Sequence, residues 1–179
     1  MTKTQKRLLQ ISSILWVVWG LVHMMAGTIV LSADTQTGFS ALADAVSAED
    51  LIANYHPAIG AILNQHAWNL FWFGSVTTVG AFFIWRASSF AIVVTALIGG
   101  FADVGYFIFL DIGGFVNFMP GTVMTIISAT AIMLSMAVYV QLRPRGTTLK
   151  NNINNRNDKV PFIRPWGLVA HLSLVRWIG

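Results

Sequence analysis

An acidic side chain, Asp103, lies within an otherwise apolar stretch, residues 90–110, of sequence FAIVVTALIGGFADVGYFIFL. A stretch of this length and composition is typical of a helix that crosses a bilayer. A carboxylate at that depth costs about 2.5–3.5 kcal/mol on insertion scales, so it usually has a buried partner or a function. Ala91, Thr95 and Gly99 precede it at four-residue intervals. A helix therefore places Asp103 on a small-residue face that is directed toward protein rather than lipid.

His23 is the candidate partner of Asp103. It lies in the first apolar stretch, three residues after Gly20 and four before Gly27, on another small-residue helix face. At a rise of about 1.5 Å per residue, His23 and Asp103 each lie roughly 4–5 Å outward of the centres of their spans. We therefore predict that the two side chains meet across the first and third spans. Such a pair handles protons, because each partner changes the pKa of the other.

Two further polar residues, Asn69 and His66, lie on one side of the second predicted span. The same arithmetic places Asn69 about 10 Å and His66 about 15 Å outward of the span centre. They are predicted to extend a polar track from the Asp–His pair to the outer surface, where His56 and Asp111 lie.

Other interpretations of these residues remain open. A quinone headgroup, a small polar ligand or a metal ion would use the same groups. A single His or Asn in a span often forms only an interhelical hydrogen bond worth about 0.6 kcal/mol, so packing is the simpler reading of His23 or Asn69 taken alone. The higher insertion cost favours a functional role for Asp103. Tyr106, one turn later, is read as a phenol that reaches the outer interface.

The residue types exclude several other kinds of site. Without cysteine the chain has no disulfide, thiol nucleophile, iron–sulfur cluster or thioether-linked haem. The difference in depth between His23 and His66, about 10 Å, argues against haem held by two histidines. No HExxH or similar spacing predicts a metal site. No nucleophile–base arrangement indicates an enzyme, and no cofactor is identified.

The composition predicts an all-α fold, a polytopic membrane protein built as an antiparallel four-helix bundle. Hydrophobic residues make up 55% of the chain and charged residues 10%, against about 25% charged in soluble proteins. The chain is long enough for one domain. The transmembrane domain is predicted over residues 1–140, with spans at 11–31, 67–85, 90–110 and 122–140.

The distribution of basic residues predicts the orientation. Basic residues fall on one side of the predicted spans: Lys3, Lys6 and Arg7 near the N-terminus, Arg86, and Arg143 with Arg145. The segments 32–66 and 111–121 on the other side contain no Lys or Arg. The positive-inside rule therefore places both termini in the cytoplasm of a bacterial-type inner membrane. Topology accounts for the net charge of +4, so nucleic-acid binding is not indicated. Four tryptophans toward span ends are predicted to be interfacial anchors, with Trp19 deeper: Trp16, Trp68, Trp72 and Trp85.

The outer segment 32–66 and the first part of the tail are polar, whereas residues 160–179 are apolar again. Ser47, with Asp50 three residues later, predicts a helix N-cap and a short surface helix through about Tyr55. Pro57 fits the first turn of the next helix, which begins before the second span. The Asn-rich part of the tail is predicted to be disordered. Residues 160–179 are read either as an interfacial segment or as an extension without a role.

Three segments resemble the small four-helix inner-membrane proteins of the DoxX-like type: GLVHMMAG (20–27), NQHAWNLFWFG (64–74) and GGFADVGYFIFLDIGG (99–114). The resemblance is one of layout and covers about the first 140 residues. It implies a quinone or redox setting, because some DoxX-like members are associated with quinol-oxidising assemblies. It implies no role for an individual residue.

We therefore expect a small ligand- or proton-binding membrane subunit that uses Asp103 and His23, with Asn69 and His66 as further candidates. The alternative is a non-catalytic assembly subunit whose polar residues align the helices. The expected partners are the lipid bilayer and either a larger membrane complex or a second copy of the chain.

Overall fold

A computed structural model of the protein describes residues 1–142, and all their regular structure is helical. Four helical segments are long and apolar enough to cross a membrane, as the sequence predicted. The predicted tail, including residues 160–179, lies outside the described residues, except for its first two positions. The elements are α1 (Lys3–Ser32), α2 (Thr35–Leu42), α3 (Pro57–Trp85), α4 (Ser89–Tyr106), the π-helical turns η1 (Phe107–Asp111) and η2 (Phe118–Thr122), and α5 (Val123–Leu142).

The long helices begin at local capping signals. α1 starts eight residues before the predicted span, because Thr2 and Gln5 form a capping box around its first turn. α3 starts at Pro57, as predicted, and the His56 ring accepts a hydrogen bond from the Ala58 backbone N–H at 3.2 Å. α4 continues through η1 to Asp111, close to the predicted end of that span. The predicted loop 111–121 is partly helical, because η2 begins at Phe118.

The predicted surface helix from Ser47 to Tyr55 is wrong. That segment forms turns, and the helix of the outer segment is α2 instead. α2 is capped by Asp34, whose side chain accepts a hydrogen bond from the Thr37 N–H at 2.8 Å. Its apolar residues Phe39 and Leu42 pack against a cluster of Val30, Leu63 and Ala67. The later segment has no such buried face, since Ile52 is 68% exposed. Packing therefore selected the segment that has apolar residues to bury.

The helices of the bundle contact one another through small residues. α1 packs most extensively on α3 and also on α5, while α4 contacts α3 and α5. A Cβ added to Gly20 of α1 would lie 2.6 Å from the backbone oxygen of Gly74 in α3. The two backbones approach this closely only because both positions are glycine.

Trp16 belongs to the core and not to the membrane interface. Its side chain is 0% exposed and packs with Trp19, Ile84 and Ile92 in the main hydrophobic cluster. Its predicted role as an interfacial anchor is therefore wrong. The indole ring fits because α4 has Gly99 opposite it, where a Cβ would lie 2.6 Å from ring atom Cη2.

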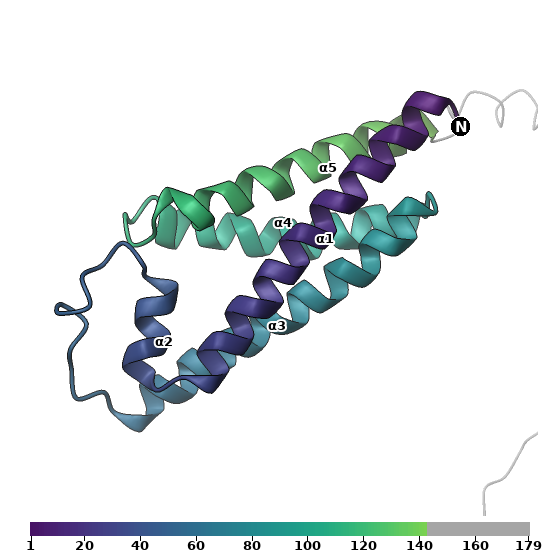
Figure 1. The fold of residues 1–179 in the computed structure, drawn as a ribbon. Helices are drawn as coiled ribbons and strands as arrows, with labels where there is room; N and C mark the ends of the chain where they lie inside the picture. The colour runs from purple at the N-terminus through teal and green to yellow at the C-terminus, as the bar shows by residue number, and fades with distance from the viewer. Residues whose placement is uncertain (143–179) are drawn as a thin grey trace, which may run out of the picture. The chain divides into compact units, whose positions relative to one another are not determined.

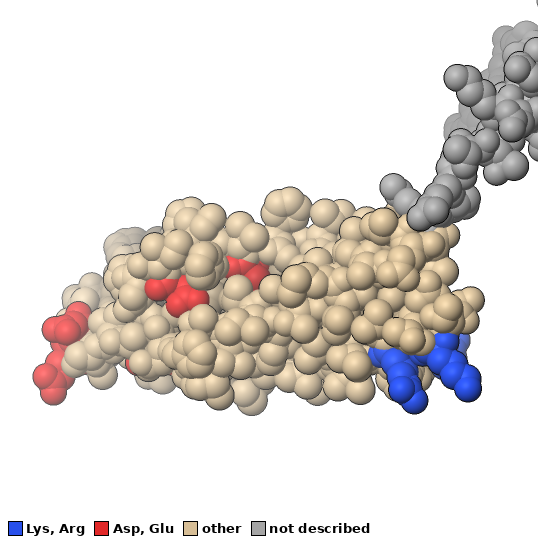
Figure 2. All heavy atoms as spheres, turned by 90° about the horizontal axis from the view of Figure 1, so that it is seen from above, with Lys and Arg blue, Asp and Glu red and all other residues tan. Residues whose placement is uncertain are grey.

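The two helix pairs separate toward one end. Figure 1 shows α1 with α3 and α4 with α5 close together near the N-terminus and farther apart at the end where α2 lies between them. Figure 2 shows Lys and Arg side chains gathered at the N-terminal end and acidic side chains toward the α2 end. The candidate site lies between the diverging helix pairs, next to α2.

Candidate functional site: a buried Asp–His pair beside a small cavity

Asp103 and His23 meet inside the helical bundle. His23 Nε2 lies 3.9 Å from Asp103 Oδ1, and the two side chains are 12% and 6% exposed. α1 presents His23 and α4 presents Asp103, each from a face of small residues; on α4, Ala91, Thr95 and Gly99 are all buried. The predicted buried pair between the first and third spans is confirmed.

Trp19 holds both members of the pair. Its indole Nε1–H donates to Asp103 Oδ2 at 2.8 Å. Its backbone oxygen lies 2.8 Å from His23 Nδ1. Its ring stacks on the imidazole, with centroids 3.6 Å apart and planes inclined by 21°. From the sequence, Trp19 was predicted to lie deep in its span, without a role in the pair. The available signal was its position four residues before His23, which puts both rings on one helix face.

The hydrogen bonds around His23 determine which ring nitrogen faces the acid. The Trp19 carbonyl only accepts, so Nδ1 must carry a hydrogen and donate it. In the neutral ring, Nε2 is then an unprotonated acceptor that faces the carboxylate oxygen of Asp103. Two acceptors in this arrangement require a proton on one of them or a water molecule that donates to both. The geometry therefore defines a site for one proton or one water between Nε2 and Oδ1.

A small cavity adjoins the pair on the α2 side. Its volume is about 100 Å³, and it extends from His23 and Asp103 to α2 and the loops at that end of the bundle. At roughly 30 Å³ per liquid water, it has room for about three waters. Polar side chains of three helices and of the loop after α2 line it together with aliphatic residues: His23 (α1), His66 (α3), Asp103 and Tyr106 (α4), and Asp44 of the loop.

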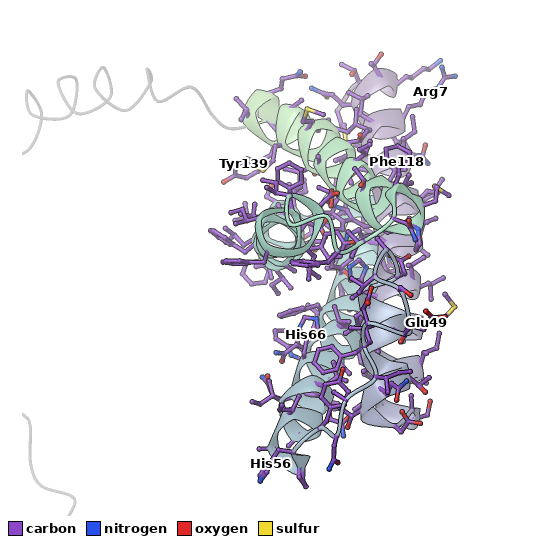
Figure 3. All side chains as sticks on the ribbon, turned by 90° about the vertical axis from the view of Figure 1, so that its left-hand side faces the viewer. Arg7, Glu49, His56, His66, Phe118 and Tyr139 are labelled. Carbon is purple, nitrogen blue, oxygen red and sulfur yellow. The ribbon has the colours of Figure 1, made fainter. Side chains whose placement is uncertain are left out.

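The other predicted site residues occupy different positions. His66 is exposed and lies at the cavity wall, well separated along α3 from His56 (Figure 3). Asn69 does not line the cavity, and its side-chain oxygen accepts a hydrogen bond from Trp72 Nε1 at 3.1 Å. Asp111 accepts from the Thr122 hydroxyl at 2.9 Å and so ties η1 to η2. The structure thus brings His66 toward the Asp–His pair, whereas Asn69, His56 and Asp111 have local partners.

Tyr106, which the sequence predicts only as a phenol reaching the outer membrane interface, lines the cavity. Its hydroxyl lies against Gly121 of η2, where a Cβ would collide with it. Glycine at this position therefore leaves room for the phenol. Two π-helical turns flank this region, and such turns are often found at functional sites.

Asp103 also borders an apolar groove of about 570 Å³ between α4 and α5. Phe101, Val104 and Ile108 line this groove, and all three are exposed on the bundle surface. Ser128 of α5 is the next polar neighbour of the carboxylate. The acid therefore lies between an internal cavity whose largely apolar wall includes several polar side chains and an apolar external groove.

Within residues 1–142, no three His, Asp or Glu side chains lie close enough together to hold a metal ion. No protein-family model matches this chain, and neither a curated protein nor a solved structure matches it.

Proposed function

We propose that this chain is an integral membrane protein that binds a proton on its buried Asp103–His23 pair and a small polar ligand, water included, in the adjoining cavity. The supporting observation is that His23 Nε2 faces Asp103 Oδ1 at 3.9 Å while the other ring nitrogen is occupied by the Trp19 carbonyl. The two facing acceptor atoms can together bind one proton.

The proposal includes an antiparallel bundle in a bacterial-type inner membrane, with the N-terminus and the end of α5 in the cytoplasm. Four sufficiently long apolar helices support the membrane location. The basic residues Lys3, Lys6, Arg7 and Arg86 support the orientation, because they gather at the N-terminal end of the bundle (Figure 2) and the segments 32–66 and 111–121 contain no Lys or Arg.

The cavity size favours a proton, water or a comparably small ligand over a quinone headgroup. A cavity of about 150 Å³ is known to hold benzene, and the present one is about 100 Å³. A substituted quinone ring is larger than benzene. A DoxX-like quinone or redox setting therefore stays part of the proposal only as an association with a larger complex.

A second candidate is a structural subunit in which the polar residues only align the helices. The observation in its favour is that Asp103 Oδ2 already has a good partner in the Trp19 indole at 2.8 Å. A buried hydrogen bond of this kind specifies one packing arrangement of the helices without any further role.

Infrared spectroscopy of the protein in bilayers separates the two candidates. We expect the wild type minus Asp103→Asn difference spectrum to contain a carboxylic acid C=O stretching band that appears and disappears reversibly with pH. Asp34→Asn is the matched control, because Asp34 is exposed and caps the N-terminus of α2, outside the Asp–His pair and the cavity. If the wild type minus Asp103→Asn spectrum shows no band that changes with pH, the pair exchanges no proton and the structural candidate stands.

A further inference from the structure

We infer that the Asp103–His23 pair exchanges protons with one face of the membrane only, the face that carries α2, through water in the cavity. This inference rests on the proposed function and adds the route. Its three supports are the position of the cavity, the packing on the opposite side of the pair, and the apolar character of the groove between α4 and α5.

On the α2 side, polar groups continue from the pair to the loops. His66 from α3, Tyr106 from α4 and Asp44 after α2 line the same cavity as His23 and Asp103. These are the titratable groups that face the cavity; α5 contributes Met124 to its wall, and the Ser128 hydroxyl of α5 lies beside the acid. Water in a cavity of this size finds the two to four hydrogen-bonding partners that it needs. A chain of such waters joins the pair to the loop surface.

On the N-terminal side, the pair is sealed by close packing. Trp16 and Trp19 are 0% exposed and meet edge to face, with ring centroids 5.6 Å apart. Beyond them Leu9, Ile84 and Val138 are also buried at 1% exposure or less. About ten residues of α1, or roughly 15 Å, separate His23 from Ser13 in this packed region.

The groove between α4 and α5 supplies no aqueous route. It borders Asp103, but Phe101, Val104 and Ile108 line it at the depth of the spans. At that depth its neighbours are acyl chains, which carry no protons.

Three hydrogen bonds join the two loops at the mouth of the cavity, where Asp44 and Val116 line it. The Asn117 backbone N–H donates to Asp44 Oδ1 at 2.7 Å, and its side-chain amide donates to the Asp44 backbone oxygen at 2.9 Å. The Ala45 N–H donates to the Phe115 oxygen at 3.2 Å. Both bonds of Asn117 are exposed to solvent, so water competes for them and the mouth opens easily.

The absence of native cysteine allows a direct test with single-cysteine variants of the full chain in sealed proteoliposomes. Ala26→Cys and Leu70→Cys report on the cavity. Ser13→Cys reports on the packed side, and it is nearly isosteric at a position that is 3% exposed. Ser47→Cys and Ser89→Cys are exposed markers for the two ends. A small membrane-impermeant thiol reagent is applied to one face at a time.

We expect the cavity cysteines to react from the same face as Ser47→Cys and not from the face of Ser89→Cys, while Ser13→Cys reacts from neither. A pH step on the α2 face alone should also change the Asp103 carboxyl band. The inference is overturned if the cavity cysteines react from the Ser89 face, if neither cavity cysteine reacts, or if a pH step on the opposite face changes the band. Any of these results leaves proton binding by the pair, tested by the equilibrium infrared titration, intact.

Discussion

Replacing Asp103 by Asn and by Val separates the hydrogen bonds of the acid from its charge. Asn keeps an oxygen for the Trp19 indole N–H and offers an amide N–H to His23 Nε2, so it reproduces the bonds of a protonated carboxyl. Val has a similar size but no polar atom. It leaves the Trp19 N–H, now bonded at 2.8 Å, and the His23 nitrogen without their partner.

The expected losses of stability follow from these bonds. Hydrogen bonds in membrane bundles average about 0.6 kcal/mol and reach about 1.7 kcal/mol, and a buried donor left unpaired costs about 1–3 kcal/mol. We expect Asp103→Val to lower the free energy of unfolding by about 1–3 kcal/mol. We expect Asp103→Asn to change it by less than about 1 kcal/mol, since the bond from Trp19 persists and the amide N–H faces His23 Nε2.

The assay is reversible unfolding in bicelles or mixed micelles, followed by circular dichroism, with the indole N–H signal of Trp19 as a local probe. Asn should preserve the downfield shift of that signal and Val should remove it. If Asp103→Val is as stable as the wild type, the Trp19–Asp103 bond contributes nothing and the account of the pair is wrong. If Asp103→Asn is as damaging as Val, a charge is required for folding and not only the hydrogen bonds.

Three other predictions test the surroundings of the site. Gly99→Ala should lower stability by about 1–3 kcal/mol through a collision with the Trp16 ring, whereas Gly105→Ala on the same helix, with nothing within 4 Å of the added Cβ, should be neutral or stabilising by up to about 1 kcal/mol; equal effects in the unfolding assay would contradict the packing described. The backbone N–H of Thr37 and then its hydroxyl lower the pKa of the Asp34 carboxyl below its ordinary value of 3.8. The stabilisation of α2 by this carboxylate is therefore present above pH 3.8 and is lost as the pH falls through the lower pKa of the folded state. Amide exchange in α2 should accelerate in that pH range in the wild type and not in Asp34→Asn, because Asn caps the helix without a charge. Asn117→Ala removes one bond at the mouth and should speed labelling of a cavity cysteine about two- to tenfold, while an unchanged rate would show that the mouth does not limit access.

The sequence alone determined the class of fold and the main contact. Apolar stretches of sufficient length predict the four helices, because only such stretches bury enough surface in lipid. The four-residue spacing of Ala91, Thr95 and Gly99 before Asp103 predicts an inward-facing acid. The matched depth of His23 predicts its partner, and the structure places the two as expected.

Only the tertiary structure decided which neighbours surround the pair. Tryptophans are predicted to lie at interfaces from their average behaviour, but Trp16 is buried because Gly99 on another helix leaves space for its ring. Helix periodicity gives the face of a residue and its depth, but it contains no information on how two helix pairs diverge. The cavity and the position of α2 between the helix pairs arise from that divergence, which depends on contacts between residues far apart in the chain.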